Sequence, residues 1–381
     1  MSALYSWSRF ALRTAASAAG VEGRPTKLIY IVTKRCHSRC VYCDIWKVKD
    51  TPGGLDGELT LDEVRKVAGA NPFLQWIDFT GGEPTDRPDF VELVQAFSVA
   101  CPDLLLVHFP TNGIATKRIT GVVGHLKDLL RARLVVTVSI DGPPELNDRL
   151  RGIRNDFGHA VDSFVAIRRL LGPENAFVGM TLHGCKASCG FTTTELVERT
   201  FTAVNDALQA RGEAPIGWGE FHLNIPHLSE HYYGNEHSDA TAKDGFGGPA
   251  HRAEIADALR FAAARTKSGG LTAMRAVERI YRSEAMRYLA HEPMSITCSA
   301  LLSTAYLSEK GDVYPCTIWD RPLGNVRTTG YALMPLIEAA RRQGVRQEVA
   351  DRRCPNCWTP CEAYPAIGTS PLQSLAALVR G

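Results

Sequence analysis

The chain contains 381 residues, 45% of them hydrophobic and 22% charged, so it can bury a large core in one big domain or a domain with an appendage. Its formal net charge is only +2 and no lysine- and arginine-rich block occurs, which gives no indication of a nucleic-acid partner. No stretch reaches the roughly 20 apolar residues of a membrane span, and eleven cysteines without a secretory signature indicate metal ligation in a reducing, cytoplasmic setting rather than a disulfide framework.

Residues 1–26 are predicted to form an extension before the main domain. Trp7 and Phe10 share this segment with Arg9 and Arg13. Such a segment suits a short helix packed on the main domain. A helix lying on a membrane surface is the alternative, because apolar and basic side chains together favour that position.

Between residues 27 and 290, apolar β-like runs alternate with amphipathic helix-like segments, the first of which opens with a capping box at Thr60. This alternation predicts right-handed βαβ units and a parallel sheet. Six units are fewer than the eight of a closed barrel, so we expect an α/β fold with a partial (β/α)6 TIM-like barrel, whose site lies at the carboxyl ends of the strands. The predicted strands are 28–32, 76–79, 104–109, 134–140, 176–182 and 219–224.

The loop after the first strand carries three thiols, Cys36, Cys40 and Cys43, in the spacing CxxxCxxC. Thiolates are the usual ligands of iron–sulfur clusters. Three thiols leave one iron of a four-iron cluster without a protein ligand, and an open position lets a metal site bind and activate a molecule. A structural zinc site and a reactive dithiol remain alternatives at this point.

The next three strands also end in polar or glycine-rich segments. These segments are Thr80-Gly81-Gly82-Glu83-Pro84, Pro110-Thr111-Asn112-Gly113 and Ser139-Ile140-Asp141-Gly142-Pro143. Paired glycines allow close approach of the backbone to a ligand, and a carboxylate there can accept hydrogen bonds from a ligand ammonium group. An ordinary turn explains any one segment, but it explains the whole series less well.

These residues carry a family resemblance. CxxxCxxC after the first strand and Gly-Gly-Glu-Pro after the second resemble the radical S-adenosylmethionine (SAM) superfamily over about residues 27–290. The segment from Ser139 to Gly142, followed by 147–152, resembles the SPASM/twitch branch. Asn147 stands where that branch usually has histidine, which leaves the role of this position open.

The resemblance implies that Cys36, Cys40 and Cys43 hold a [4Fe-4S] cluster whose open iron chelates SAM. One-electron reduction there cleaves SAM to methionine and a 5′-deoxyadenosyl radical, which abstracts hydrogen from a substrate, while the protein supplies position and a dry cavity. The residues expected to contact the cofactor are Tyr42, Gly81, Gly82, Glu83, Thr111, Asn112, Ser139, Asp141 and Arg151.

A second group of cysteines occurs in residues 291–365, before a predicted tail at 366–381. A hairpin turning at Gly311 is predicted between Cys298 and Cys316, and Cys354 and Cys357 follow. Four thiols suit a second cluster, although the spacing also fits a zinc ribbon. The arrangement resembles the twitch domain, a shortened SPASM domain with one auxiliary [4Fe-4S] cluster. Cys361 either replaces one of the four ligands or lies free beside the cluster.

Three side chains are candidates for catalysis. Glu220 and His222 alternate along the sixth strand and are expected to share one face, and Cys185 lies in the loop after the fifth strand. The 224–234 segment is polar and aromatic enough to line a pocket. Solvent-facing polar residues and incidental cysteines are the alternative interpretation.

The leading expectation is a radical SAM enzyme that oxidises, by dehydrogenation, a small molecule, assisted by the auxiliary cluster. Modification of a ribosomal peptide is the main alternative, a lipid-like substrate is the third, and a non-enzymatic iron–sulfur or zinc protein is the remote one. The first three require an external electron donor of the flavodoxin or ferredoxin type.

Overall fold

The computed structural model describes residues 23–183, 190–236, 247–266 and 273–380, together with residues 16 and 21. The described chain is organised around one nine-stranded sheet with the order β6-β5-β4-β3-β2-β1-β7-β8-β9. The strands are β1 (Lys27–Thr33), β2 (Trp76–Gly81), β3 (Leu106–Thr111), β4 (Arg133–Ser139), β5 (Ala176–Thr181), β6 (Phe221–Asn224), β7 (Thr304–Leu307), β8 (Asp312–Tyr314) and β9 (Gly324–Asn325).

The strands β1 to β6 follow one another across the sheet in chain order, and each is parallel to the next. All seven residues of β1 are buried, because helices cover one face of this strand and the barrel interior covers the other. The six predicted strands match the observed ones to within two residues at each end. The predicted α/β fold with a partial barrel is therefore confirmed.

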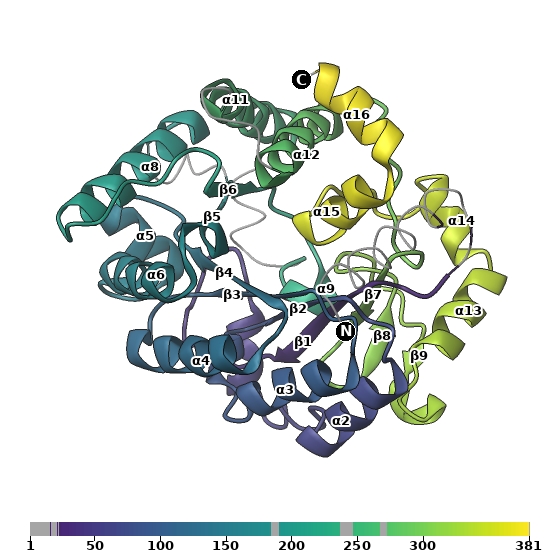
Figure 1. Ribbon diagram of the computed structural model, residues 1–381. Coiled ribbons are helices and arrows are strands. Elements are labelled where there is room, and N and C mark those ends of the chain that lie inside the picture. Colours follow the sequence, from purple (N-terminus) through teal and green to yellow (C-terminus); the bar gives the residue numbers. More distant parts are fainter. Residues whose placement is uncertain are drawn as a thin grey trace.

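The helices form an outer layer around the sheet, and Figure 1 shows α2, α3, α4, α6 and α8 in succession along its outside. The capping box at the start of the first helix is present: Thr60 caps Glu63 and Glu63 reaches back to Thr60. The helices are α2 (Leu61–Ala70), α3 (Phe90–Ala100), α4 (Thr116–Leu129), α5 (Pro144–Arg151), α6 (Asp156–Leu171), α8 (Thr193–Gln209), α9 (Glu230–Tyr233), α11 (Pro249–Thr266), α12 (Ala273–Leu289), α13 (Met334–Arg342), α14 (Val345–Ala350), α15 (Pro360–Thr369) and α16 (Pro371–Arg380), with short 3-10 helices η1 (Ile45–Asp50), η2 (Pro84–Asp86), η3 (Pro173–Asn175) and η4 (Val326–Thr329).

The C-terminal part of the chain extends the barrel sheet. β7 pairs in parallel with β1, and β8 and β9 follow in antiparallel order. β7 and β8 form the predicted hairpin, with Gly311 at its turn in a left-handed conformation (φ 88°). The boundary predicted at residue 366, between the cysteine-rich region and a C-terminal tail, falls inside α15. Both α15 and α16 pack against α12, so the last residues continue the helical layer. Within the described chain, no helix combines the length and the apolar character needed to cross a membrane.

Candidate functional site

The cysteine loop leaves the carboxyl end of β1 and is held by backbone hydrogen bonds on two sides. The N–H of Arg39 donates to the carbonyl of Arg151 at 2.8 Å, and the N–H of Val41 donates to that of Leu150 at 2.9 Å. On the other side, the N–H of Asp44 donates to the carbonyl of Tyr233 at 2.9 Å. The end of α5 and the end of α9 therefore fix the shape of the loop before any cluster is bound.

The three thiols of this loop lie close enough to influence one another. Burial, together with the neighbouring Cys40, raises the pKa of Cys36 to about 12. Burial also raises the pKa of Cys43, with added contributions from Cys40 and Cys36. The protein alone thus keeps these thiols protonated, so metal binding there must release protons.

No group of three or more His, Cys, Asp or Glu side chains in the described ranges is arranged to hold a single metal ion. A four-iron cluster does not need that arrangement, because each thiolate binds a different iron. The donor set and the burial of Cys36 fit a cluster with three protein ligands.

Gly81 and Gly82 bring the end of β2 against the cysteine loop. The N–H of Gly82 donates to the carbonyl of Thr33 at 2.9 Å. A Cβ atom on Gly82 would lie 1.9 Å from the carbonyl oxygen of Arg35, and one on Gly81 would lie 2.2 Å from that of Thr33. The observed reason for both glycines is this close backbone contact. Contact of these glycines with SAM stays a prediction.

Glu83 links the ends of β2 and β3 from a fully buried position. Its carboxylate accepts hydrogen bonds from the Thr111 hydroxyl at 3.0 and 3.1 Å, from the Asn112 N–H at 2.7 Å and from the Thr85 hydroxyl at 2.6 Å. Burial raises the pKa of Glu83, and these donors oppose the rise. The side chain of Asn112 continues toward the cysteine loop, with its Nδ2 atom 4.0 Å from the Sγ atom of Cys36.

A buried network at the end of β4 joins the predicted residues Tyr42, Asp141 and Arg151. The Tyr42 hydroxyl donates to the Asp141 carboxylate, which also pairs with Arg151 at 2.6 Å. Asn147 accepts from the Asp141 N–H at 2.8 Å and donates to Asp156 at 2.8 Å. The amide of Asn147 therefore holds both carboxylates in place, which gives this position a structural role without histidine.

His183, which follows β5, lies beside this network. Its ring stacks on that of Tyr42 with centroids 4.2 Å apart. Both ring nitrogens are buried without a hydrogen-bond partner in the described chain, and burial lowers the pKa of His183 to about 4. The loop that begins at His183 is expected from the sequence to face the site, but only Cys185 in it is among the candidates; the place of His183 at the end of a predicted strand was a usable signal. Ser139 ends β4 with a half-buried side chain, on the same edge of the sheet.

The cysteines of the C-terminal region fall into two places. Cys298, Cys316 and Cys357 pack in one cluster with Ile318 and Val349. Two of these thiols have amide neighbours, since the N–H of Ala300 donates to Cys298 at 3.5 Å and that of Trp319 donates to Cys316 at 3.4 Å. Such hydrogen bonds favour thiolates and tune cluster potentials. Burial, with smaller contributions from neighbours that include Cys354, raises the pKa of Cys298 to about 12.

Cys361 lies elsewhere, although it follows Cys357 closely in the chain. It packs on the cluster that contains Ile29, Tyr232 and Tyr306, inside the barrel. Its carbonyl accepts a hydrogen bond from the Lys27 ammonium at 2.8 Å. The structure thus separates Cys361 from the thiols that gather near Cys316.

One segment, from 225 to 235, touches both cysteine sets. Asn235 donates to the carbonyl of Tyr42 at 3.0 Å, next to Cys43. At the other end, the Ser229 hydroxyl donates to the carbonyl of Thr317 at 2.8 Å, and a ring nitrogen of His231 lies 3.1 Å from the carbonyl of Cys316. This bridge between the two candidate cluster sites overlaps residues 224–234, which are predicted to line a pocket, and that role stays a prediction.

The candidates for catalysis occupy different places. Glu220 lies before β6, at the amino end of the sheet, where its carboxylate accepts from the N–H of Gly217 at 2.8 Å. The other side-chain contact of Glu220 is with Arg168 at 3.8 Å, which also lies away from the cysteine loop. A catalytic role for Glu220 stays a prediction. His222 is buried inside the barrel and stacks on Phe177 with centroids 4.5 Å apart. Cys185 lies outside the described residues.

Sequence reasoning missed a buried polar chain across the first three strands. Lys27 pairs with Asp78 at 2.6 Å, and Asp78 lies 3.3 Å from a ring nitrogen of His108. Burial alone would raise the pKa of Asp78, but Lys27 and His108 outweigh burial and hold it below its usual range. The available signal was a polar residue inside the second and third apolar runs, Asp78 and His108, and one directly before the first, Lys27, because such residues are rarely buried without a partner.

Residues 30–184 match the family model of the Radical SAM superfamily. The match covers the cysteine loop, the Gly81–Gly82–Glu83 segment and the network at the end of β4. The chain thus contains a radical SAM domain, as predicted. The twitch-type assignment of the C-terminal region stays a prediction.

Among characterised proteins, the chain is 35% identical over 147 residues to the PqqA peptide cyclase of Bradyrhizobium diazoefficiens, which is 36% of this chain and 35% of that one. It is 34% identical over 135 residues to the mycofactocin maturase MftC of Mycobacterium tuberculosis, covering 34% and 31%. It is 35% identical over 96 residues to a probable GTP 3′,8-cyclase of Pyrococcus abyssi, covering 24% and 28%. The chain spans about a third of the length of these relatives, whose names support the prediction that it is an enzyme.

Among solved structures, the chain is similar to SuiB of Streptococcus suis bound to S-adenosylmethionine, with a TM-score of 0.48, 12% identity and coverage of 83% of this chain and 68% of that one. It is also similar to BtrN in complex with AdoMet and 2-DOIA, with a TM-score of 0.40, 11% identity and coverage of 88% and 94%.

Proposed function

We propose that the chain is a radical SAM enzyme that modifies a peptide by abstracting hydrogen, with a [4Fe-4S] cluster on Cys36, Cys40 and Cys43. A second [4Fe-4S] cluster is assigned to Cys298, Cys316, Cys354 and Cys357. When bound, the first cluster supplies the 5′-deoxyadenosyl radical from SAM, and the second accepts or relays an electron. This division of labour suits a net oxidation of the substrate.

The observation that carries the proposal is the segment from 225 to 235, which contacts both cysteine sets. It forms hydrogen bonds to Tyr42 on one side and to Thr317 and Cys316 on the other. These bonds hold the two cysteine sets at a fixed distance and orientation. Independent metal sites need no such connection. Electron transfer between a substrate cavity and a second cluster requires such a fixed distance.

The chain's own residues prepare the cofactor cavity. Arg151 is kept charged inside the protein: burial alone would lower its pKa, but its electrostatic neighbours outweigh burial and raise it. The carboxylates of Asp141 and Asp156 lie 2.6 and 3.2 Å from its guanidinium group. A buried cation beside the loop can pair with the negative charge of a SAM carboxylate or of the cluster itself. Tyr42 and His183 add a stacked aromatic wall on the same side, and together these groups exclude water.

A peptide is favoured as substrate by the names of two relatives, a peptide cyclase and a maturase. Dehydrogenation of a small alcohol-bearing molecule is the second candidate, because the auxiliary site suits an oxidation of either substrate. Incubation with peptides encoded beside the gene, followed by mass spectrometry, should show the loss of two hydrogens per product. SAM cleavage coupled to a small molecule, and not to any such peptide, would contradict the peptide assignment.

Anaerobic reconstitution with an iron count and a SAM-cleavage assay tests the central proposal. The wild type should bind about eight irons and form 5′-deoxyadenosine on reduction. Replacement of Cys36, Cys40 and Cys43 by alanine should leave about four irons and abolish cleavage. Zinc in place of iron, together with no cleavage, would overturn the proposal.

A further inference from the structure

We propose that the cavity beside the cysteine loop is the docking surface for a small acidic protein that carries a low-potential one-electron centre. The inference rests on the proposed function, because a radical SAM enzyme must receive one electron per SAM cleaved. The cavity has a volume of about 1080 Å³ and lies between the cysteine loop, the start of α4 and the first half of α6.

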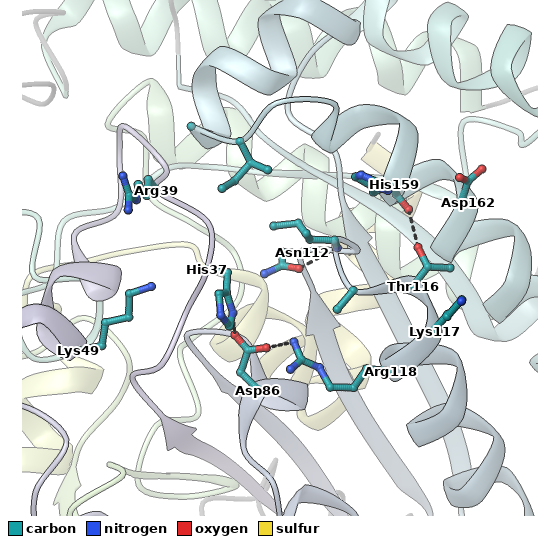
Figure 2. Close-up of a pocket in the computed structure, with 14 residues that line it drawn as sticks. His37, Arg39, Lys49, Asp86, Asn112, Thr116, Lys117, Arg118, His159 and Asp162 are labelled. Carbon is teal, nitrogen blue, oxygen red and sulfur yellow. Dashed lines mark hydrogen bonds and ion pairs between the residues drawn. The ribbon is translucent and has the colours of Figure 1, made fainter.

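The charge of this cavity is positive. Arg39 and Lys49 lie on one side of it and Lys117 and Arg118 on the other, with Asn112 between them (Figure 2). The two acidic residues of the lining are already paired. Asp86 pairs with both His37 and Arg118.

The other lining acid, Asp162, pairs at 2.7 Å with Arg211, which lies outside the cavity. Lys117 is exposed and forms no ion pair within the described ranges. The cavity therefore presents an excess of positive charge that attracts an anionic surface and speeds its association.

The positions of Lys117 and Arg118 are unfavourable for helix stability alone. Both lie in the first turn of α4, where the helix dipole disfavours cations. The first turn has no acidic residue, and Ala115 gives it no side-chain cap. Asp86 already neutralises Arg118, so Lys117 is the cation whose local cost an anionic partner would offset.

The cavity also reaches a thiol of the candidate cluster through one side chain. Asn112 lines the cavity and places its Nδ2 atom 4.0 Å from the Sγ atom of Cys36. Lys49, on the opposite wall, donates to the carbonyl of Cys36 at 2.8 Å. A carrier seated here is thus separated from the cluster ligand by a single layer of residues, which favours direct transfer of one electron from the reduced carrier to the oxidised cluster.

Binding of a flavodoxin to the reconstituted enzyme tests this assignment. The wild type should bind at low ionic strength and lose affinity as salt is added, because exposed charges are screened. Lys117→Glu, and more so the double change Lys117→Glu with Arg118→Gln, should weaken binding by about tenfold or more and slow cluster reduction by flavodoxin hydroquinone to a similar extent.

The matched control is Lys127→Glu, which reverses a charge at the other end of the same helix. It should bind flavodoxin as the wild type does. Reduction by titanium(III) citrate should be equal in all variants, and 5′-deoxyadenosine formed with that reductant tests the proposed function without any carrier. The docking assignment is overturned if wild-type enzyme that is active with titanium(III) fails to bind flavodoxin, or if Lys117→Glu binds as tightly as Lys127→Glu.

Discussion

Cys357 and Cys361 differ in surroundings despite their short separation in the chain. Cys357 packs with Cys316 and Cys298, whereas Cys361 packs with Tyr232 and Tyr306 inside the barrel. Cys357→Ser should therefore remove about four irons from the reconstituted protein, and Cys361→Ser should remove none. Iron and sulfide analysis of the two variants measures this directly. Equal losses would show that Cys361 is itself a ligand.

Asn147 offers a second test at the scale of single residues. Its amide joins the Asp141 N–H and Asp156 in a region that is almost fully buried. Asn147→Leu leaves those groups without partners and should lower the free energy of unfolding by about 1–3 kcal/mol. Thermal unfolding of the metal-free protein provides the measurement. Asn155→Gly is the comparison, because the exposed Asn155 side chain makes no cap hydrogen bond and glycine tolerates the left-handed backbone there (φ 60°). Equal effects would refute a special role for Asn147.

At the scale of the elements, the contact between the end of β2 and the cysteine loop depends on Gly82. A methyl group there would lie 1.9 Å from the Arg35 carbonyl oxygen, so Gly82→Ala must displace the loop. The variant should lose the four irons of the first cluster and retain those of the second. Gly69→Ala in α2 is the control, because nothing lies within 4 Å of the added methyl group and alanine favours the helix. A Gly82→Ala protein with full iron content would contradict this account.

Local patterns made the elements of the barrel predictable. The six apolar runs, the capping box at Thr60 and the hairpin around Gly311 each depend on residues close in sequence, and all are present. The parallel pairing of β7 with β1 joins segments that are far apart in the chain, and no local signal encodes it. For the same reason, the sequence left the place of Cys361 open and did not reveal the bridge formed by residues 225–235.

At the scale of the molecule, a polar contact joins the barrel to the C-terminal region. Arg327 in η4 binds both carboxylate oxygens of Glu63 in α2, at 2.5 and 3.1 Å. The hydrogen bond from Arg327 is the largest cause that lowers the pKa of Glu63 to about 2. The same arginine donates to the carbonyls of Lys310 and Gly57, so it ties the β7–β8 turn to the loop before α2.

The sign of the resulting pH dependence follows from the lowered pKa. Glu63 is still charged in the folded protein at pH values where it is protonated in the unfolded chain, so the ion pair stabilises fully above about pH 5 and loses its effect as the pH falls toward 2. Glu63→Gln keeps the capping hydrogen bond to Thr60 but removes the charge. It should lower the stability of the metal-free protein by about 0.5–1 kcal/mol at pH 7, and by progressively less between pH 5 and pH 3.

Asp62→Asn is the matched control, because the ion pair of Asp62 with Arg65 lies within α2 and is largely exposed. Denaturant unfolding at several pH values should show a pH-dependent deficit for Glu63→Gln and little change for Asp62→Asn. The double variant with Arg327→Met should cost less than the sum of the two single variants, since the effects of contacting partners are not additive. If Glu63→Gln lowers the free energy of unfolding by the same amount at every pH, the charge of Glu63 does not contribute to the contact between the barrel and the C-terminal region. Arg327 would then hold the two parts together by packing and by its other hydrogen bonds.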